Sequence, residues 1–288
     1  MNKLNLSGAI ITFEDFHKRK DIGSSRIRAF NVCKKWGDDI GTLEPFIIGK
    51  HYDFIIYQKV YWTDHARAYK GFKILDLCDP DFLHWGYPVQ EMLQEVDVIT
   101  VSSSELEKSL KSMTNKPVYL VNDGVLVDKN SPLKIHKGKA KKVVWYGYAE
   151  NFPLLDACIS TIDKLGLDLI VISSKPYIIT NTNSNIKLTN YPWSVNWLKD
   201  IVRGDIVLNP TFRTGKWKYK SNNKTTQAWA LGMPVATNDT ELLAFVDETN
   251  RQAEAEKRLT EVMNEWTTER SVSRLKEIIE KHYGQHNI

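Results

Sequence analysis

One stretch, KSNNKTTQAWALGMPVATN at residues 220–238, combines cationic and small polar residues with an apolar run directly behind them. The start of a helix presents unpaired backbone N–H groups and partial positive charge, which attract phosphate. Flanking lysines would help to neutralise a departing diphosphate. We therefore predict an anion cradle, with Lys220, Asn222, Asn223, Lys224, Thr225, Thr226 and Gln227 as candidate ligands. The alternative is an ordinary helix cap with solvated lysines.

A second candidate anion contact is GSSRIRAF at residues 23–30, which follows the first predicted strand. Gly23 gives the backbone freedom, Ser24 can cap a helix, and Arg26 could reach an anion. Arg28 is a candidate for the same role. An ordinary capped helix with surface arginines explains the segment equally well.

Carboxylates and a histidine occur together in DPDFLHW, residues 79–85, just after another predicted strand. Asp79 and Asp81 have the spacing of a pair that could hold a metal ion with a diphosphate, although we do not favour this interpretation. Asp79 and His84 are candidate catalytic groups. For His84 a purely structural role is the competing interpretation.

Strand ends in the second half offer further ligand contacts. In WYGYAENFP (145–153), Gly147 permits a ligand to approach the backbone closely, and Asn151 could contact a sugar or a phosphate. Ser173 and Lys175 end the next predicted strand and are candidate contacts for a base or a ribose.

The elements that must position these residues alternate between strands and helices. Apolar runs predict strands at 7–13, 52–60, 72–78, 96–102 and 117–122, and again at 142–148, 167–174, 185–191, 205–210 and 234–238. Helical segments lie between them, for example at 24–36 and at 102–113, the second opened by Ser and Glu at the spacing of a cap. This alternation predicts crossover connections and mostly parallel sheets. We expect an α/β protein with two Rossmann-like doubly wound domains facing a cleft. Their predicted ranges are 1–127 and 143–288, joined by a basic linker at 128–142.

The C-terminal part after Leu242 is highly charged and predicted to be helical. Its candidate buried residues are Phe245, Leu259, Val262, Met263, Trp266, Leu275, Ile278 and Ile279. We place these helices in the second domain.

Composition is typical of a globular protein of 288 residues, with 42% hydrophobic residues and a net charge of +4. The sequence pI of about 8.7 permits an anionic partner without specifying one. No signal peptide or membrane span is predicted. The three cysteines, Cys33, Cys78 and Cys158, form no metal or disulfide pattern, which suits the cytoplasm, or a host cytoplasm if the protein is phage-encoded.

Several segments together resemble the GT-B glycosyltransferases of group 1, the family 4-like enzymes. They are NDGV (122–125), VVWYGYAENFP (143–153), DIVLNP (205–210) and TTQAWALGMPVATN (225–238). The resemblance implies an acceptor-side N-terminal domain and a C-terminal domain that binds a nucleotide diphosphate sugar, such as UDP-glucose. It also implies transfer with retention of configuration, without a metal or a permanently bound cofactor.

The resemblance extends to individual positions. It places Tyr191 and Trp193 of YPWS where the family brackets the nucleotide base, and Asp79 or His84 among the catalytic residues. The family carries two Glu residues near its donor loop, whereas this chain has Tyr219 and Gln227 there. A Gln can hydrogen-bond a hydroxyl, but it is not a carboxylate.

The acceptor is predicted from basic stretches interleaved with aromatic residues, which suit nucleic acid. These are HKRK (17–20), KIHKGKAKK (134–142) and KWKYKSNNK (216–224). They resemble features of phage-type enzymes that glycosylate hydroxymethylated bases in DNA. A cell-surface or lipid-linked glycan is the alternative acceptor. A nucleotide-sugar epimerase and a non-catalytic nucleotide-sugar-binding protein are alternatives to the transferase, and no oligomeric state is predicted.

Overall fold

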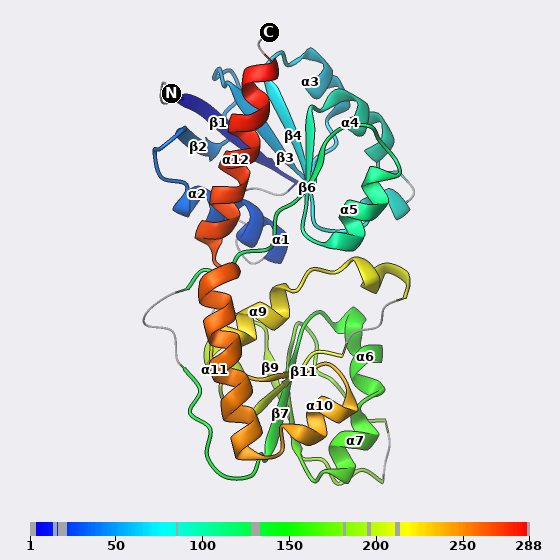
Figure 1. Cartoon of the computed structure of the whole chain (residues 1–288). Coiled ribbons are helices and arrows are strands. Elements are labelled where there is room, and N and C mark those ends of the chain that lie inside the picture. The colour runs from blue at the N-terminus through cyan, green and yellow to red at the C-terminus, as the bar shows by residue number, and fades with distance from the viewer. Residues whose placement is uncertain are drawn as a thin grey trace. The chain divides into compact units, whose positions relative to one another are not determined.

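A computed structural model describes residues 4–13, 16, 22–84, 86–127, 133–180, 183–194, 197–210 and 214–286. The chain forms two compact units (Figure 1). The first unit comprises Met1–Leu126, Lys218–Asn222 and Trp266–Ile288, and the second comprises Val127–Trp217 and Asn223–Glu265.

The first unit contains a six-stranded parallel sheet with the order β2-β1-β3-β4-β5-β6. Its strands are β1 (Leu6–Thr12), β2 (Gly41–Pro45), β3 (Phe54–Gln58), β4 (Phe72–Leu77), β5 (Val98–Val101) and β6 (Val118–Leu120). Every residue of β3 and β5 is buried, as expected of parallel strands covered on both faces. All carboxyl ends therefore meet at one edge, which positions the loops discussed below.

Helices cover both faces of this sheet. They are α1 (Gly23–Ser25), the π-turn η1 (Arg26–Phe30), α2 (Asn31–Lys35), α3 (Thr63–Ala68), the 3-10 turn η2 (Asp81–Leu83), α4 (Val89–Glu95), α5 (Ser104–Lys111) and α12 (Thr268–His286). The expected helix at 24–36 is thus interrupted by a π-turn. A serine caps α5, as expected, and it is Ser103, whose hydroxyl accepts a hydrogen bond from the Leu106 N–H at 3.3 Å.

The second unit contains a five-stranded parallel sheet with the order β11-β10-β7-β8-β9. Its strands are β7 (Lys142–Tyr146), β8 (Asp168–Ser173), β9 (Leu188–Pro192), β10 (Ile206–Leu208) and β11 (Val235–Ala236). Its helical elements are η3 (Ala149–Asn151), α6 (Phe152–Asp156), α7 (Ile159–Lys164), α8 (Trp197–Ile201), α9 (Asn223–Trp229), α10 (Asp239–Ala244) and α11 (Glu248–Glu265), and η4 (Gly215–Tyr219) leads out of the unit. The predicted strands of this half are confirmed, with shorter bounds.

The division into units differs from the expected ranges in two places. The expected C-terminal domain included all residues from 143 to 288, but α12 packs in the first unit, where Ile278 and Ile279 join Phe54 in a core cluster. The segment 218–222 also lies in the first unit, because Tyr219 is buried in that unit's other core cluster. Of the expected linker, residues 128–132 lie outside the described residues and Lys142 already belongs to β7.

Burial along the C-terminal helices agrees with the prediction for most positions. Phe245, Val262, Leu275, Ile278 and Ile279 are buried. The prediction that Met263 is buried is wrong, since this residue is 49% exposed. Leu259 and Trp266 are only half-buried. Within the described part of the chain, no helix is long and apolar enough to cross a bilayer.

Packing of α12 against the first sheet gives a direct test of this division. Ile279 is fully buried in that interface. Replacing Ile279 by Ala should lower the free energy of unfolding by about 2–5 kcal/mol, because it leaves a cavity in a packed core. Glu280 is exposed on the same helix, so Glu280→Ala should change the free energy of unfolding by less than about 0.5 kcal/mol. Urea unfolding measures both, and equal effects of the two substitutions would contradict the packing of α12.

Candidate active site

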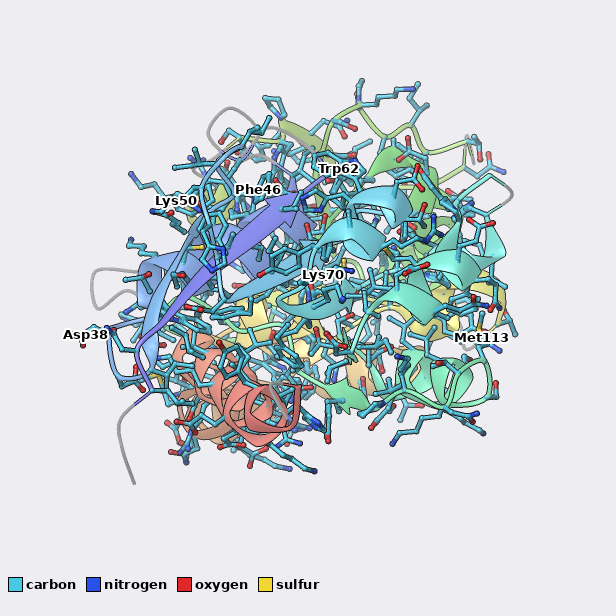
Figure 2. The ribbon with its side chains drawn as sticks, turned by 90° about the horizontal axis from the view of Figure 1, so that it is seen from above. Asp38, Phe46, Lys50, Trp62, Lys70 and Met113 are labelled. Atoms are coloured by element: carbon cyan, nitrogen blue, oxygen red, sulfur yellow. The ribbon has the colours of Figure 1, made fainter. Side chains whose placement is uncertain are left out.

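Exposed apolar side chains gather in the loops at the carboxyl edge of the first sheet. They follow β1, β2, β3 and β4 and comprise Phe13, Ile47, Ile48, Trp62, Leu83 and Tyr87. The ring of His65 lies 6.0 Å from Trp62 of this group and 5.4 Å from the partly buried Phe46, which precedes Ile47. Figure 2 shows Phe46 and Trp62 close together. We call the six exposed residues the apolar rim.

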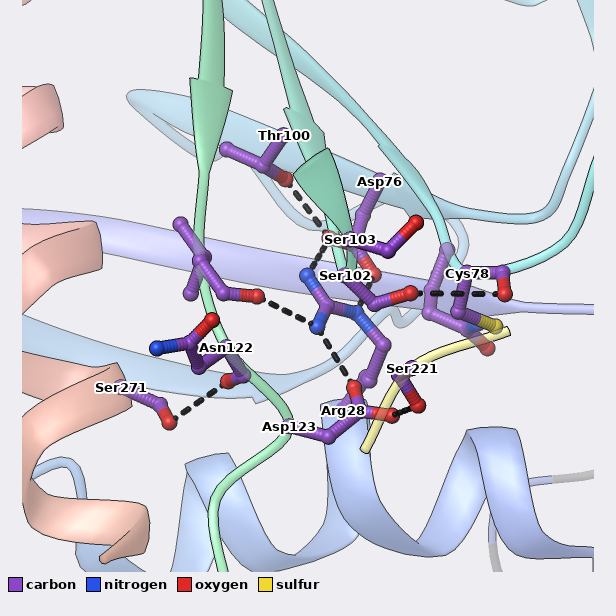
Figure 3. A network of polar contacts seen from close by, with 12 residues as sticks. Arg28, Asp76, Cys78, Thr100, Ser102, Ser103, Asn122, Asp123, Ser221 and Ser271 are labelled. Atoms are coloured by element: carbon purple, nitrogen blue, oxygen red, sulfur yellow. Dashed lines mark hydrogen bonds and ion pairs between the residues drawn. The ribbon is translucent and has the colours of Figure 1, made fainter. Parts of the chain in front are cut away.

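Arg28 does not face an anion site, which corrects its interpretation as a candidate anion contact. Its Nε and Nη2 donate to the two oxygens of Asp76 at 2.7 and 2.5 Å, and its Nη1 donates to Asp123 and to the Val121 carbonyl, both at 2.8 Å (Figure 3). Thr100 donates a further hydrogen bond to Asp76 at 2.6 Å. Burial alone would lower the pKa of Arg28, but the two carboxylates raise it. The guanidinium is therefore a buried structural cation.

The other candidates of the segment after β1 are nearer to solvent. The strand order reverses at β1, which has β2 on one side and β3 on the other, and ligands in such sheets bind beside this reversal. Gly23 opens α1 with open space where a Cβ would lie, and Ser24 and Arg26 are half-buried. Their expected contact with the donor stays a prediction.

Asp79 is held between two lysines at the carboxyl ends of β3 and β4. Its two oxygens accept hydrogen bonds from Lys59 and from Lys220, each at 2.7 Å. Burial opposes ionisation of Asp79, but Lys220 and Lys59 outweigh it and lower its pKa. Asp79 is therefore an ionised group in a locally cationic setting.

Asp81 has the opposite electrostatic character. It is buried, and it accepts a hydrogen bond from the Tyr61 hydroxyl at 2.6 Å. Burial raises the pKa of Asp81 despite Lys59, whose ammonium lies 3.7 Å away. Two neighbouring carboxyl groups with opposite pKa shifts are a common basis for dividing acid and base roles. Lys59 and Tyr61 were not among the predicted site residues, although their place directly after β3 is a usable signal.

His84 lies beside this arrangement, and its backbone N–H donates to the Asp81 carbonyl at 3.0 Å. It follows η2, is exposed, and lies edge-on to the Tyr87 ring at 6.2 Å. Its proposed catalytic role stays a prediction.

The predicted cradle is divided between the two units. Lys220 and Asn222 belong to the first unit, whereas α9 begins at Asn223 and belongs to the second. The physical reason is that Tyr219 is anchored in the first core and Lys220 pairs with Asp79. Lys220 is thus paired within the first unit, and its expected role beside Lys224 in one cradle stays a prediction.

In the second unit the structure brings Lys224 and Gly147 together at the carboxyl end of β7, where the order of the second sheet reverses. The Lys224 ammonium lies 5.3 Å from the centre of the Trp145 ring. A Cβ built on Gly147 would lie 2.5 Å from Lys224 Nζ, so only glycine leaves this space to the ammonium. The Tyr146 hydroxyl donates to the Lys224 carbonyl, which fixes the start of α9.

Other polar side chains line the same edge. The Asn209 amide donates to Thr225 Oγ1 at 3.0 Å, and the Trp217 indole N–H donates to Asn151 Oδ1 at 3.1 Å. Thr226 is fully buried and bonds the Asn223 carbonyl at 3.2 Å, a helix-stabilising contact. Gln227 is half-buried.

The expected base and ribose contacts follow β8 and β9. Ser173 is buried, and its hydroxyl is one of the side-chain groups without a hydrogen-bond partner in the described part of the chain. Lys175 is exposed. Tyr191 accepts a hydrogen bond from Arg203 at 3.2 Å, and Trp193 stacks on Trp197 with ring centres 5.2 Å apart. Among the described residues, no group of three or more His, Cys, Asp or Glu could hold a metal ion.

Comparison with known proteins finds no matching family model and no matching curated protein. Solved structures do match. The chain aligns with Staphylococcus aureus TarM in complex with UDP at a TM-score of 0.59 and 11% identity, covering 78% of this chain and 54% of TarM, about half its length. The lipopolysaccharide outer core galactosyltransferase WaaB aligns at 0.63 and 10% identity over 95% of this chain and 99% of WaaB.

The DNA-modifying β-glucosyltransferase of phage T4 aligns at a TM-score of 0.57 and 12% identity, over 96% of this chain and 99% of that enzyme. At such identities the likeness concerns the fold alone. The chain has the GT-B fold of these glycosyltransferases, which confirms the expected α/β class with two Rossmann-like domains.

The pairing of Asp79 with Lys220 can be tested by titration. A carboxyl group whose pKa is lowered on folding stabilises the native state at pH values above its ordinary pKa of 3.8. This stabilisation is lost as the pH falls through the lowered pKa. Lys220→Met should raise the pKa of Asp79, because one of its two cations is removed. Carboxyl ¹³C NMR measures the shift. Lys218→Met removes a charge from the same segment and is the control, and equal effects of both variants would contradict the pairing.

Proposed function

We propose that the protein is a glycosyltransferase that moves a sugar from a nucleoside diphosphate sugar to a hydroxyl group. The observation that carries this proposal is a GT-B fold whose second sheet holds an ammonium, that of Lys224, against Gly147 at its switch point. A cation at this position suits a diphosphate, whose developing charge it would stabilise as the glycosidic bond breaks. UDP in the TarM structure supports a uridine nucleotide as the donor.

The remaining residues of the second unit have roles that agree with this proposal. Ser173 has a free hydroxyl at the end of β8 for a ribose or base, and the rings of Tyr191 in β9 and of Trp193 just after it suit the base. Asn151, Thr225 and Gln227 offer polar groups near the start of α9. In the first unit, Asp79 would act on the acceptor side. The proposed stereochemical outcome is retention, and the anomeric proton coupling of the product decides it.

We propose a hydroxymethylated base in DNA as the acceptor. The apolar rim of the first unit supports this, because exposed aromatic side chains suit stacking of a base that is flipped out of a duplex. Lys137, Lys139, Lys141 and Lys142 are exposed and suit phosphate contacts, while HKRK (17–20) lies outside the described residues. The fold likeness to the phage T4 enzyme adds support. A DNA acceptor also implies a cytoplasmic protein.

A panel assay tests donor and acceptor together. Each of several nucleoside diphosphate sugars is incubated with hydroxymethylated duplex DNA, with unmodified DNA and with glycan acceptors, and release of the diphosphate is measured. We expect turnover with a UDP-sugar and hydroxymethylated DNA that falls steeply with salt. Turnover with glycans but not with DNA would show that the acceptor is a glycan and would contradict the DNA proposal. Conversion of the donor without acceptor would indicate an epimerase, and UDP binding without turnover a silent binding protein.

The role of Lys224 gives a prediction that needs no acceptor. Lys224→Ala should weaken UDP binding about tenfold or more, because a charge-assisted hydrogen bond contributes about 1.5–3 kcal/mol. Gly147→Ala should weaken it in the same direction, since the new Cβ displaces an ammonium that keeps its charge. Lys164 is exposed at the end of α7, so Lys164→Ala serves as the control. Calorimetry measures the UDP affinity of the three variants. If Lys224→Ala and Gly147→Ala both bind UDP as tightly as the unsubstituted protein, Lys224 does not contact the diphosphate.

A further inference from the structure

The segment Lys218–Asn222, which we call the strap, comes from the second half of the chain but belongs to the first unit. It contacts residues that follow β4 and β5. The Tyr219 ring is buried and lies edge-on to Phe82 at 5.6 Å, and the Tyr219 carbonyl accepts a hydrogen bond from the Ser103 hydroxyl at 2.8 Å. The strap is thus anchored on one side of Lys220 by packing and by a main-chain hydrogen bond.

On the other side of Lys220 the anchor is electrostatic. The Ser221 hydroxyl donates to Asp123 Oδ2 at 2.5 Å, while Asp123 Oδ1 accepts from Arg28 (Figure 3). Arg28 is one cation shared by two buried carboxylates, those of Asp76 and Asp123, so the group carries one excess negative charge. A buried carboxylate oxygen without a donor is costly. The donor from Ser221 is therefore favoured by the charge of the buried network.

We propose that Asp123 and Ser221 form a latch that positions Lys220 against Asp79. The proposal rests on the function proposed above, in which Asp79 acts at the active site. Asp123 and Ser221 are positioning residues, because they act through Lys220 and Asp79.

The reason a latch matters is the freedom of the lysine. The Lys220 side chain is 53% exposed, and a long exposed side chain loses conformational entropy when it is held in one ion pair. Fixing the backbone at Tyr219 and at Ser221 reduces the number of positions open to the ammonium. The pair with Asp79 then forms at a smaller entropic cost than an isolated surface pair would.

The first measurement needs no substrate. In the full chain, Ser221→Ala should make the strap amides exchange with deuterium about tenfold faster or more, the factor that loss of a charge-assisted hydrogen bond implies. The pKa of Asp79 should rise in the same variant, because Lys220 is held less firmly. Ser221→Thr keeps the hydroxyl and should restore both values toward those of the unsubstituted protein. Ser112 bonds only a neighbouring carbonyl in α5, that of Ser109 at 2.7 Å, so Ser112→Ala should change neither value.

The second measurement tests the functional consequence. In the transfer assay, Ser221→Ala should lower kcat/KM and move its acidic limb to higher pH, and Asp123→Asn should change both in the same direction. Unchanged exchange of the strap in Ser221→Ala overturns the latch. Faster exchange with an unchanged pH profile overturns the positioning role and leaves a structural contact. If the protein transfers no sugar, the proposed function fails, while exchange and the pKa of Asp79 still decide whether the latch exists.

Discussion

The buried ion pairs of Arg28 are the interaction on which the first unit's functional edge depends. Arg28 stands in η1, and its guanidinium joins Asp76 of β4 to Asp123, which follows β6. Removing one partner from such a group leaves an uncompensated buried charge, which typically costs about 3–5 kcal/mol. The group therefore holds the ends of β4 and β6, which lie on either side of β5, in one arrangement, and the segments that follow these strands are positioned by it.

The strap shows what that arrangement makes possible. Ser221 reaches the carboxylate that Arg28 has oriented, and Lys220 reaches Asp79 two residues beyond the end of β4. Asp79 is then an ionised group between two cations, whereas buried Asp81 has a raised pKa. One small region thus contains carboxyl groups suited to different protonation states, which no single-residue motif indicates.

The fold could be predicted from the sequence because its signal is local. Continuous apolar runs such as FIIYQ are typical of parallel strands, and turn and cap residues mark where they end. The site could be predicted in part, since Gly147 and Lys224 lie at a strand end and at a helix start. The return of 218–222 and of α12 to the first unit could not be predicted, because amphipathic helices and short loops do not specify which core they cover. Arg28 was misread for a related reason: a sequence does not show that two carboxylates from distant strands surround it.

The two candidate edges differ in how their cations are held, and this difference has a functional meaning. Lys220 and Lys59 are both paired with Asp79, so this one carboxylate compensates one of the two positive charges. Lys224 instead lies over the face of Trp145, at the carboxyl end of β7. The proposed donor site is in the second unit, where Lys224 and Gly147 lie together at the switch point of the sheet. The proposed acceptor side is the first unit, where Asp79 and the apolar rim lie at the carboxyl edge of the sheet.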